Sequence, residues 1–517
     1  MALPNESRRD QASLSESVLL FVDRAQAVSP GLEWQPEDMR HIARICNLVG
    51  GMPLAIELAA TWVDTLSPCE IADEIEQNLD ILGANRRDTP NGQHSIRAAF
   101  DRSWAMLDST QQAAFRRLSV FRGGFTREAG EAVARVGLRN LQALVNKSLL
   151  RRNPASNRYE FHELLRHYAM EQLKRPAKPR RSIGNTLCTS ASFMADRWPR
   201  LRDREQKSAL HQVEADIENA RAAWQYWVKD RNVEQLRQFL HTFWAVYEIR
   251  GWYITGVDLF EQAVIVVRAL NTEEARAVLA GFWWYRACSA WRAATTAART
   301  PPAPSWMAAH GLYFARGAAD LRGASALAQE GIRILNNLSR PDDEMRMVPL
   351  ISLFIIDCLL DEEGVPLRTA QECLEVATRL GDPWATAKAR QFLAVRAIQD
   401  GEMERAESLG RSALEIFESR GDHWSKSIVC IELLALVAIV DRRFEEAKDW
   451  MRAGLRAAEE IGYKYSIQTA YWQLGFVAVL EDNYAEAGQY WRRALGIADG
   501  NLGSATFIGF GGSSGRE

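Results

Sequence analysis

Long hydrophobic runs are missing from this sequence of 517 residues. The nearest candidate, Ile428 to Val440, contains Glu432 and is shorter than the ~20 apolar residues that a membrane-spanning helix needs. The first residues, 1–12, are polar and lack the apolar centre of a signal peptide. These absences predict a cytoplasmic protein that has no membrane partner.

Cysteine is scarce, and charge of neither sign is in excess. The seven cysteines are scattered without a C-x-x-C pair, which is typical of reduced and mostly buried thiols in a reducing compartment. The 63 basic and 66 acidic residues give a net charge of -3. This balance argues against a protein that coats nucleic acid or a membrane surface.

A zinc-protease motif, H-E-x-x-H, is absent although one stretch looks like it. In HELLRH the two histidines, His162 and His167, are five residues apart. Five residues rotate a side chain around a helix by about 140°, so the two imidazoles would lie on different faces and could not meet one zinc ion. Paired carboxylates and catalytic triads are not recognisable either, because the acidic residues lie at salt-bridging spacings on helix faces. We expect neither a metal site nor a catalytic residue.

Strand signals are few, and helical periodicity runs through almost the whole chain. The pattern predicts a mainly all-α fold, with a small helical bundle, a winged-helix domain with a short β-hairpin, and an α-α superhelix of repeats. The expected parts, in chain order, are a disordered start at 1–12, a helical domain at 13–90, a winged helix at 91–175, a linker and helix at 176–213, helical repeats at 214–500 and a flexible glycine-rich tail at 501–517.

Capping residues mark the helices of the first two domains. Ser15 is expected as an N-cap, and Ser67 with Glu70 three residues later forms the capping-box pattern. Asp108 and Thr126 mark two further helix starts. After the four helices expected between residues 95 and 150, two short apolar-polar runs flank the turn-rich NPASN. Helices closed by a hairpin in this order predict a winged helix.

The second half of the chain contains an internal repeat of about 40 residues. Three clear copies begin at Gly381, Gly421 and Gly462. A small residue opens the second helix of each copy, and another follows seven residues later: Ala406, Ala447 and Ala487, then Ala413, Gly454 and Ala494. Extended backward, the frame passes through 324, 366, 406, 447 and 487, in steps of 42, 40, 41 and 40 residues. The repeat resembles the tetratricopeptide repeat with a longer linker, and its small residues should let paired helices approach closely.

Four other stretches have structural interpretations. The aromatic residues from Phe282 to Trp291 are expected in the core of a repeat helix. The segment from Trp291 to Trp306 breaks the repeat frame and is an insertion or a degenerate repeat. The basic stretch from Lys174 to Arg181 is expected to be a solvated linker. The glycine-rich stretch from Gly509 to Gly515 is expected to be a flexible tail and not a dinucleotide-binding loop.

Three motifs occur in an order that is found in one family. They are GMPLAIELAA, which begins at Gly51, then AAFDRSWAMLDSTQQAAFRRLSVFRGGFTREAGEAV, and then FHELLRHYAMEQL, which begins at Phe161. Together they resemble the segment that follows the nucleotide-binding core in STAND signalling ATPases of the NB-ARC type. In bacteria these proteins are often LuxR-like or other transcriptional regulators with helical repeats behind them. The resemblance runs from about Ser15 through the repeats.

The resemblance implies a nucleotide-binding role for four residues. In the family a G-L-P-L motif lies near the adenine of the nucleotide. This chain reads GMPL there, so Met52, Pro53 and Leu54 are candidates. The family's M-H-D motif supplies a histidine that contacts the β-phosphate of ADP and holds the resting state. This chain reads FHE, which makes His162 the fourth candidate, and a capping or packing histidine is the alternative.

The nucleotide-binding core itself is absent from the sequence. There is no phosphate-binding G-x-x-x-x-G-K-[ST] loop and no hydrophobic strand that ends in acidic residues for magnesium. The nearest lysine-serine pair, Lys147-Ser148, has no preceding glycine and lies in an amphipathic helix. We therefore expect a non-enzymatic protein without a cofactor of its own, which would meet ADP or ATP only through a core on another chain. The start of the chain would then be a truncation, a split gene or a fragment.

Three functions remain open at this point. The first is the sensor half of a STAND-type regulator, whose concave repeat surface binds a protein, a peptide or a small effector. The second is a plain repeat scaffold with relic N-terminal modules. The third is a transcription factor that binds DNA through the winged helix, which is less favoured because its recognition-helix candidate offers only Arg139 and Lys147 as cations.

Overall fold

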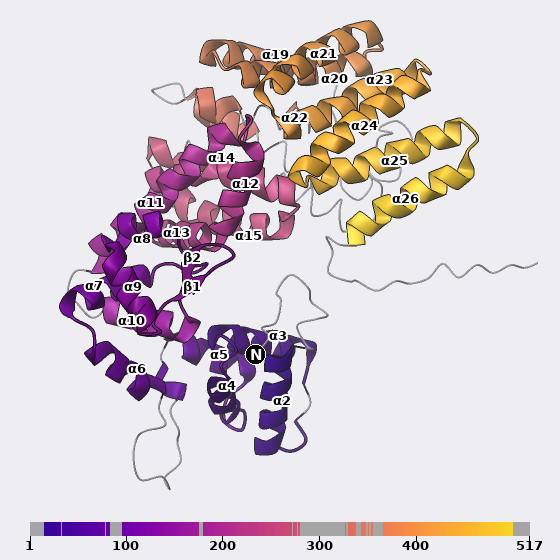
Figure 1. Cartoon of the computed structure of the whole chain (residues 1–517). Coiled ribbons are helices and arrows are strands. Elements are labelled where there is room, and N and C mark those ends of the chain that lie inside the picture. Colours follow the sequence, from indigo (N-terminus) through magenta and orange to yellow (C-terminus); the bar gives the residue numbers. More distant parts are fainter. Residues whose placement is uncertain are drawn as a thin grey trace, which may run out of the picture. The chain divides into compact units, whose positions relative to one another are not determined.

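The fold is mainly α-helical, as the sequence predicts, and the described residues form two compact units (Figure 1). The computed structural model describes residues 15–32, 34–77, 79–82, 96–174, 179–270, 272–276 and 365–499, with short stretches between 278 and 354. The first unit extends to Thr189, and the second from Ser190 to Leu502. The predictions for residues 282–306, for the C-terminal tail and for most of the basic stretch 174–181 lie outside the described side chains.

The first unit begins with short helices whose ends follow the predicted signals. These elements are α2 (Glu16–Val28), α3 (Pro36–Leu48), α4 (Pro53–Ala60), α5 (Pro68–Gln77) and the 3-10 helix η1 (Leu79–Leu82). The Ser15 side chain accepts a hydrogen bond from the backbone of Val18 and caps α2. Ser67 and Glu70 exchange the two hydrogen bonds of a capping box at the start of α5. The capping predictions here are confirmed.

Helices and one hairpin make up the rest of the first unit. Their bounds are α6 (Ile96–Ala105), α7 (Ser109–Leu118), α8 (Arg127–Ala134), α9 (Leu138–Asn146), β1 (Arg151–Asn153), β2 (Arg158–Glu160) and α10 (Glu163–Lys174). Strands β1 and β2 pair antiparallel, and the order of elements is the one predicted for a winged helix. Tyr159 also exchanges two backbone hydrogen bonds of 2.8 Å with Phe125, which ties the hairpin to the segment before α8.

One hydrophobic core runs through the whole first unit. It includes Phe21 and Ile45 from the first helices, and Phe115, Leu144 and Tyr168 from the later ones. Because α10 contacts both α3 and α6, the helical bundle and the hairpin-bearing part share this core. Their relative position is therefore set by packing, and residues from both parts can build one site.

The second unit is built from helix pairs. Its elements are the C-terminal part of α11 (Pro179–Arg200), then α12 (Gln206–Ala215), α13 (Ile217–Asp230), α14 (Val233–Arg250), α15 (Tyr253–Arg268), α19 (Val365–Leu380), α20 (Pro383–Gln399), α21 (Met403–Arg420), α22 (His423–Ile428), η2 (Val429–Leu434), α23 (Ala435–Val440), α24 (Phe444–Ile461), α25 (Lys464–Leu480) and α26 (Tyr484–Asp499). Residues 176–213, predicted as a linker and helix, thus carry α11 and α12.

Small residues bring the paired helices of each repeat together. A Cβ built on Gly454 of α24 would lie only 2.5 Å from the Ile431 side chain, and one on Gly410 of α21 only 2.3 Å from the Leu433 side chain. Ala447 of α24 is fully buried in the same way. The approach at Gly454 is the one that the repeating small positions of the sequence predict, whereas Gly410 is a further small residue that meets the first helix of the next repeat.

One repeat helix contains an extra residue. In two copies, 22 positions separate the opening glycine from the start of the second helix, as from 381 to 403 and from 462 to 484, but 23 separate 421 from 444. The first helix of that middle copy is also the one that changes to a π-helix, η2. A π-helix accommodates one inserted residue in an α-helix. The 41-residue step in the repeat frame therefore arises inside a helix, and the turns keep their length.

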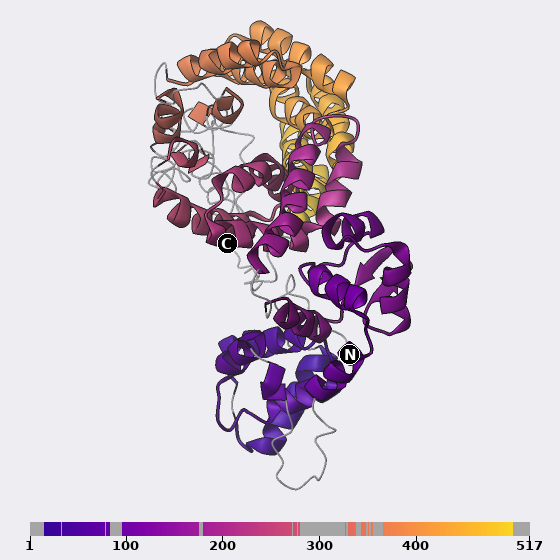
Figure 2. The same cartoon turned by 90° about the vertical axis from the view of Figure 1, so that its left-hand side faces the viewer.

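The helices at the start of the second unit pack against its last repeats. Helix α12 contacts α24, and α14 contacts α25, so magenta and yellow helices lie side by side on the ring seen in Figure 2. Gln206 of α12 lies in the centre of this contact, where it donates to Asp422 and accepts from the backbone of Trp424. The sequence pattern does not predict this closure, because periodicity describes only neighbouring repeats.

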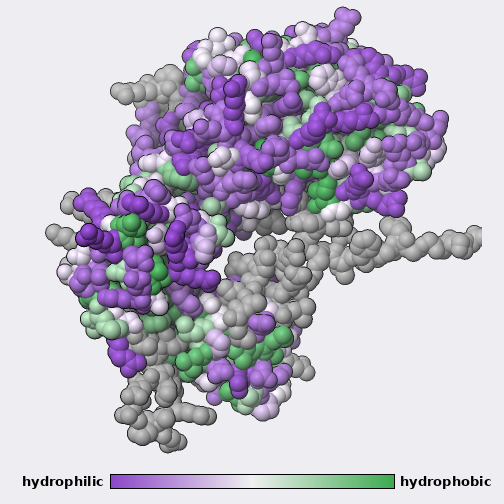
Figure 3. All heavy atoms as spheres, in the orientation of Figure 1, coloured by the Kyte–Doolittle hydropathy of each residue, from purple (hydrophilic) through white to green (hydrophobic). Residues whose placement is uncertain are grey.

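One described helical stretch, His423–Val440, is long and apolar enough by composition to cross a membrane. This corrects the expectation that no apolar stretch reaches that length, since the helix extends beyond the run read from the sequence. The stretch is 67% buried inside the unit, as is usual for a core helix of a repeat. Hydrophilic residues cover most of the face of the second unit that Figure 3 shows.

Candidate functional site

His162 lies between the hairpin and α10, at the point where α10 begins. Its backbone carbonyl accepts a hydrogen bond of 3.0 Å from the backbone N–H of Arg166, so the residue closes the first turn of that helix. Its side chain is half-buried and does not cap the helix. The imidazole instead lies against the turn that follows α3.

That turn is built from two glycines in the left-handed region. Gly50 has a φ of 61° and Gly51 a φ of 66°, conformations that residues with a Cβ adopt only with strain. A Cβ on Gly50 would lie 2.9 Å from Cε1 and 3.1 Å from Nε2 of His162. Any side chain larger than hydrogen at this position would therefore displace the imidazole. The sequence identifies Gly50-Gly51 as a helix stop but gives no sign of this contact.

The three other candidates follow the glycine turn directly. Met52 is the N-cap of α4, and Pro53 occupies its first position, as predicted. Met52 packs against the core, while Pro53 and Leu54 are exposed, with Leu54 at 49%. The structure thus brings the GMPL turn and His162 into one place within a shared core. The nucleotide-binding roles implied by the resemblance stay predictions.

The His162 imidazole is poised as a neutral donor or acceptor. Burial lowers its pKa below the usual range, and the adjacent Glu163 opposes that effect only in part. Its Nδ1 atom is buried and has no hydrogen-bond partner among the described residues. An imidazole in this state can offer one N–H to a phosphate oxygen, or gain a proton when a polyanion approaches.

Glu163 fixes the residues that follow His162. The Arg166 guanidinium donates to both carboxylate oxygens of Glu163 at 2.9 and 3.0 Å, and His167 Nε2 lies 3.3 Å from the same carboxylate. Burial would raise the pKa of Glu163, but these hydrogen bonds lower it to about 2. Arg166 also donates to the backbone carbonyl of Ser119 at 3.4 Å, which anchors α10 to the end of α7.

The two histidines of HELLRH therefore serve different purposes. His167 pairs with the Glu163 carboxylate, while His162 lies over Gly50. Within the described residues, no group of three or more histidine, cysteine or acidic side chains could hold a metal ion. The two ring positions agree with the divergence that the five-residue spacing predicts.

The residue before His162 is a core residue. The Phe161 ring lies 5.2 Å from that of Phe115 and 6.4 Å from that of Phe125, between ring centroids. A large side chain in the first place of the FHE motif thus anchors His162 to the hydrophobic core.

Helix α9, the recognition-helix candidate, offers few free cations. Lys147 donates to the backbone carbonyl of Met106 at 2.8 Å and to the Gln111 side chain at 2.9 Å. Arg139 is exposed. One of the two cations on which DNA binding by this helix would depend is already bound within the unit.

Relatives of this chain include bacterial regulators. A protein of Mycobacterium tuberculosis named "Putative HTH-type transcriptional regulator" is 27% identical over 439 residues, which cover 79% of this chain and 49% of the relative. The Regulatory protein AfsR of Streptomyces coelicolor is 33% identical over 137 residues, 24% of this chain and 13% of that protein. The chain spans about half the length of the mycobacterial relative and a smaller part of AfsR. No family model matches it.

Two solved structures are similar at low identity. One is a STAND protein with a tetratricopeptide repeat sensor from Pyrococcus horikoshii, with 16% identity and a TM-score of 0.31, covering 93% of this chain and 72% of that one. The other is BtubC from P. vanneervenii, with 15% identity and a TM-score of 0.35, covering 51% and 98%. At such TM-scores the likenesses do not define a shared arrangement of domains.

Proposed function

We propose that this chain is a regulatory protein, the sensor half of a STAND-type transcriptional regulator. The helical bundle and the hairpin-bearing part form a nucleotide-responsive module of the winged-helix type, and the repeats bind a protein, peptide or small effector. The mycobacterial relative and AfsR support a regulatory role, since both are named as regulators. A regulator of this kind works in the cytoplasm.

One observation carries the nucleotide-responsive part of the proposal. His162 and the turn that leads into the GMPL motif, more than a hundred residues apart in sequence, meet where the imidazole covers Gly50. A packing histidine needs no glycine turn in the left-handed region beneath it. A histidine that must present a nitrogen next to Met52 and Pro53 does need such a close approach.

The proposed mechanism is a switch between two arrangements of the module. If ADP is bound, His162 would donate to a phosphate oxygen and Met52, Pro53 and Leu54 would contact the adenine, which would hold the module closed. Effector binding to the repeats favours a second arrangement in which His162 no longer reaches the phosphate. The phosphate-binding loop and magnesium ligands would come from a nucleotide-binding core outside these 517 residues.

Thermal unfolding of the chain mixed with a separately expressed nucleotide-binding core, with and without millimolar ADP, tests the proposal. We expect ADP to raise the melting temperature of the wild type and of His41→Ala, but not of His162→Ala. His41 is a suitable control because it is a partly buried histidine of the same unit, on α3. No shift for the wild type would favour the plain repeat scaffold instead. Salt-dependent binding of random duplex DNA would favour the transcription factor.

A further inference from the structure

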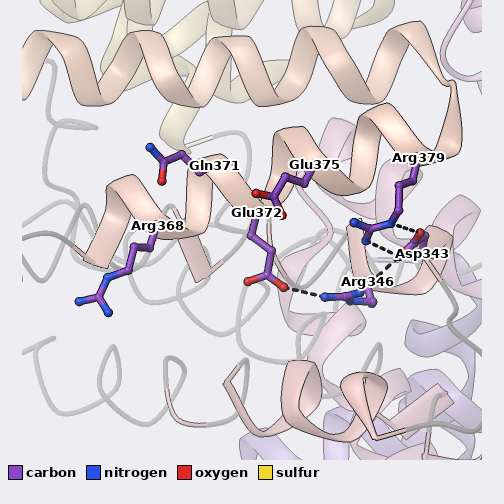
Figure 4. A pocket seen from close by; sticks show the side chains of 7 residues that line it. All are labelled: Asp343, Arg346, Arg368, Gln371, Glu372, Glu375 and Arg379. Carbon is purple, nitrogen blue, oxygen red and sulfur yellow. Dashed lines mark hydrogen bonds and ion pairs between the residues drawn. The ribbon is translucent and has the colours of Figure 1, made fainter.

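The second unit contains a charged cavity that the nucleotide switch does not use. It has a volume of about 430 Å³, within the range of small-molecule sites. One wall is the helical stretch that carries Asp343 and Arg346, and the other is α19. The α19 side chains that line it are those of Arg368, Gln371, Glu372, Glu375 and Arg379 (Figure 4).

Most of the charges in this cavity neutralise one another. Arg379 donates two hydrogen bonds of 2.8 and 2.9 Å to Asp343, which lower the pKa of that carboxyl. Arg346 lies between Asp343 and Glu372 and donates to Glu372 at 2.7 Å. These pairs join the two walls, so the cavity has a fixed frame that needs no ligand.

Two opposite charges make no ion pair in that network, although Asp343 and, with it, Glu375 act to raise the pKa of Arg379. Arg368 and Glu375 are exposed, and neither has an ion pair with another described residue (Figure 4). They are seven residues apart on α19, which places them about 10 Å apart along the helix axis.

We propose that this cavity binds a small zwitterion whose carboxylate and ammonium groups are held apart by a chain of several methylenes. The carboxylate accepts hydrogen bonds from Arg368, and the ammonium donates to Glu375. Charge-assisted bonds at both ends select length as well as charge. A free amino acid with adjacent charges could not reach both ends, and an apolar ligand would leave these groups unpaired.

The assignment rests on the proposed function, since it names the chemical class of the effector that the repeats sense. It involves only residues of the second unit, whereas the ADP response depends on His162 in the first. Loss of one response without the other therefore separates the two proposals.

Isothermal titration of the full chain with 6-aminohexanoate tests the site. Hexanoate and hexylamine keep one charge each, and glycine keeps both charges but not their separation. We expect 6-aminohexanoate to bind about tenfold or more tightly than any of the three, the change expected for one lost charge-assisted bond. Equal affinity for all four compounds, or no heat with 6-aminohexanoate, would overturn the assignment without the use of any variant.

Two variants locate the binding. Glu375→Gln should lower the affinity for 6-aminohexanoate to that for hexanoate, and Arg368→Gln should lower it to that for hexylamine. Glu415→Gln and Arg268→Gln remove matched exposed charges elsewhere in the unit and should leave the affinity unchanged. Binding that survives both cavity variants, or that falls equally in the control variants, would contradict the proposed site.

Discussion

At the scale of single residues, the contact between His162 and Gly50 is the feature on which the proposed site depends. Gly50→Ala adds a Cβ at a φ of 61° and within 2.9 Å of the imidazole. We expect a loss of about 1–3 kcal/mol in the free energy of unfolding, from backbone strain and displacement of the ring. Urea denaturation measures it.

A second glycine separates strain from contact. Gly31 also has a positive φ, of 94°, but a Cβ built there would have no neighbour within 4 Å. Gly31→Ala should therefore show only the strain, and the ADP response of the chain should survive it. If Gly50→Ala cost no more than Gly31→Ala and kept the ADP response, the contact would have no functional weight.

The lowered pKa of Glu163 predicts that the stability of the fold falls in acid. Its pKa is lowered to about 2 in the folded protein, so its charged form stabilises the fold above its ordinary pKa of 4.5. That contribution is lost as the pH falls from about 4.5 toward 2. Glu163→Gln should be less stable than the wild type at neutral pH by about 1–3 kcal/mol.

The comparison is made by urea unfolding of both proteins between pH 6 and about pH 3. The difference between their urea midpoints should stay constant down to about pH 4.5 and shrink below it. A difference that stays constant over this range would mean that the Glu163 carboxylate does not stabilise the fold through Arg166 and His167.

The sequence predicts some of this site and not the rest, for physical reasons. The spacing of His162 and His167 predicts that their rings diverge, because helix geometry is local. The cap at Ser15 and the helix start at Pro53 follow from equally local rules. The contact between His162 and Gly50 joins two segments that are distant in sequence. A periodic pattern in the sequence describes only neighbouring residues, so it cannot predict this contact.

At the scale of elements, the π-helix η2 predicts that one residue is dispensable. Deletion of Glu432 would convert the stretch to a regular α-helix and give the middle repeat the spacing of its neighbours. The buried residues on both sides would keep their places, because the bulge only loops out one residue. We expect a folded protein with a moderately lower melting temperature, measured by circular dichroism, because the buried Lys388 loses its electrostatic attraction to the Glu432 carboxylate.

Helix α20 provides the matched control because it has no such bulge. Deletion of Val395, which is partly buried there, rotates the rest of the helix by about 100° and moves its apolar face out of the core. It should lower the melting temperature far more than the Glu432 deletion. Equal losses in the two deletions would mean that η2 is required for the packing of its repeat.

The extra residue of the middle repeat is visible in the sequence, but its location is not. The step of 41 residues between 406 and 447 could lie in either helix or either turn. A turn is the usual place for an insertion, because loops tolerate length changes. Here both turns keep their length, and tight contacts such as that of Gly454 with Ile431 hold the helix on either side of η2.

At the scale of the whole molecule, closure of the second unit depends on one buried carboxylate. Asp422 is 1% exposed and accepts from Gln206 at 2.9 Å, from the Trp384 indole at 2.8 Å and from the Ser425 backbone at 3.0 Å. Asp422→Ala leaves three buried donors without an acceptor. We expect a loss of about 2–4 kcal/mol, measured by urea denaturation.

The exposed Asp230 serves as control, since Asp230→Ala removes no buried acceptor. Limited proteolysis adds a local readout: cleavage near residues 201–205, which precede α12, should accelerate in Asp422→Ala alone. Unchanged cleavage and stability would show that the start of the unit does not depend on its contact with the last repeats. The sequence could not predict this closure, because Gln206 and Asp422 are far apart in sequence and meet only when the first helices of the unit pack against its last repeats.

The central claim is that His162 contacts a nucleotide that is held by a nucleotide-binding core outside these 517 residues. The most direct measurement is the affinity of the chain for a separately expressed core that carries the G-x-x-x-x-G-K-[ST] loop, with ADP and without nucleotide. We predict that ADP strengthens the association of the wild type and of His41→Ala about tenfold or more, and leaves His162→Ala unchanged. An association that ignores ADP, or that responds to it equally in His162→Ala, would contradict the account.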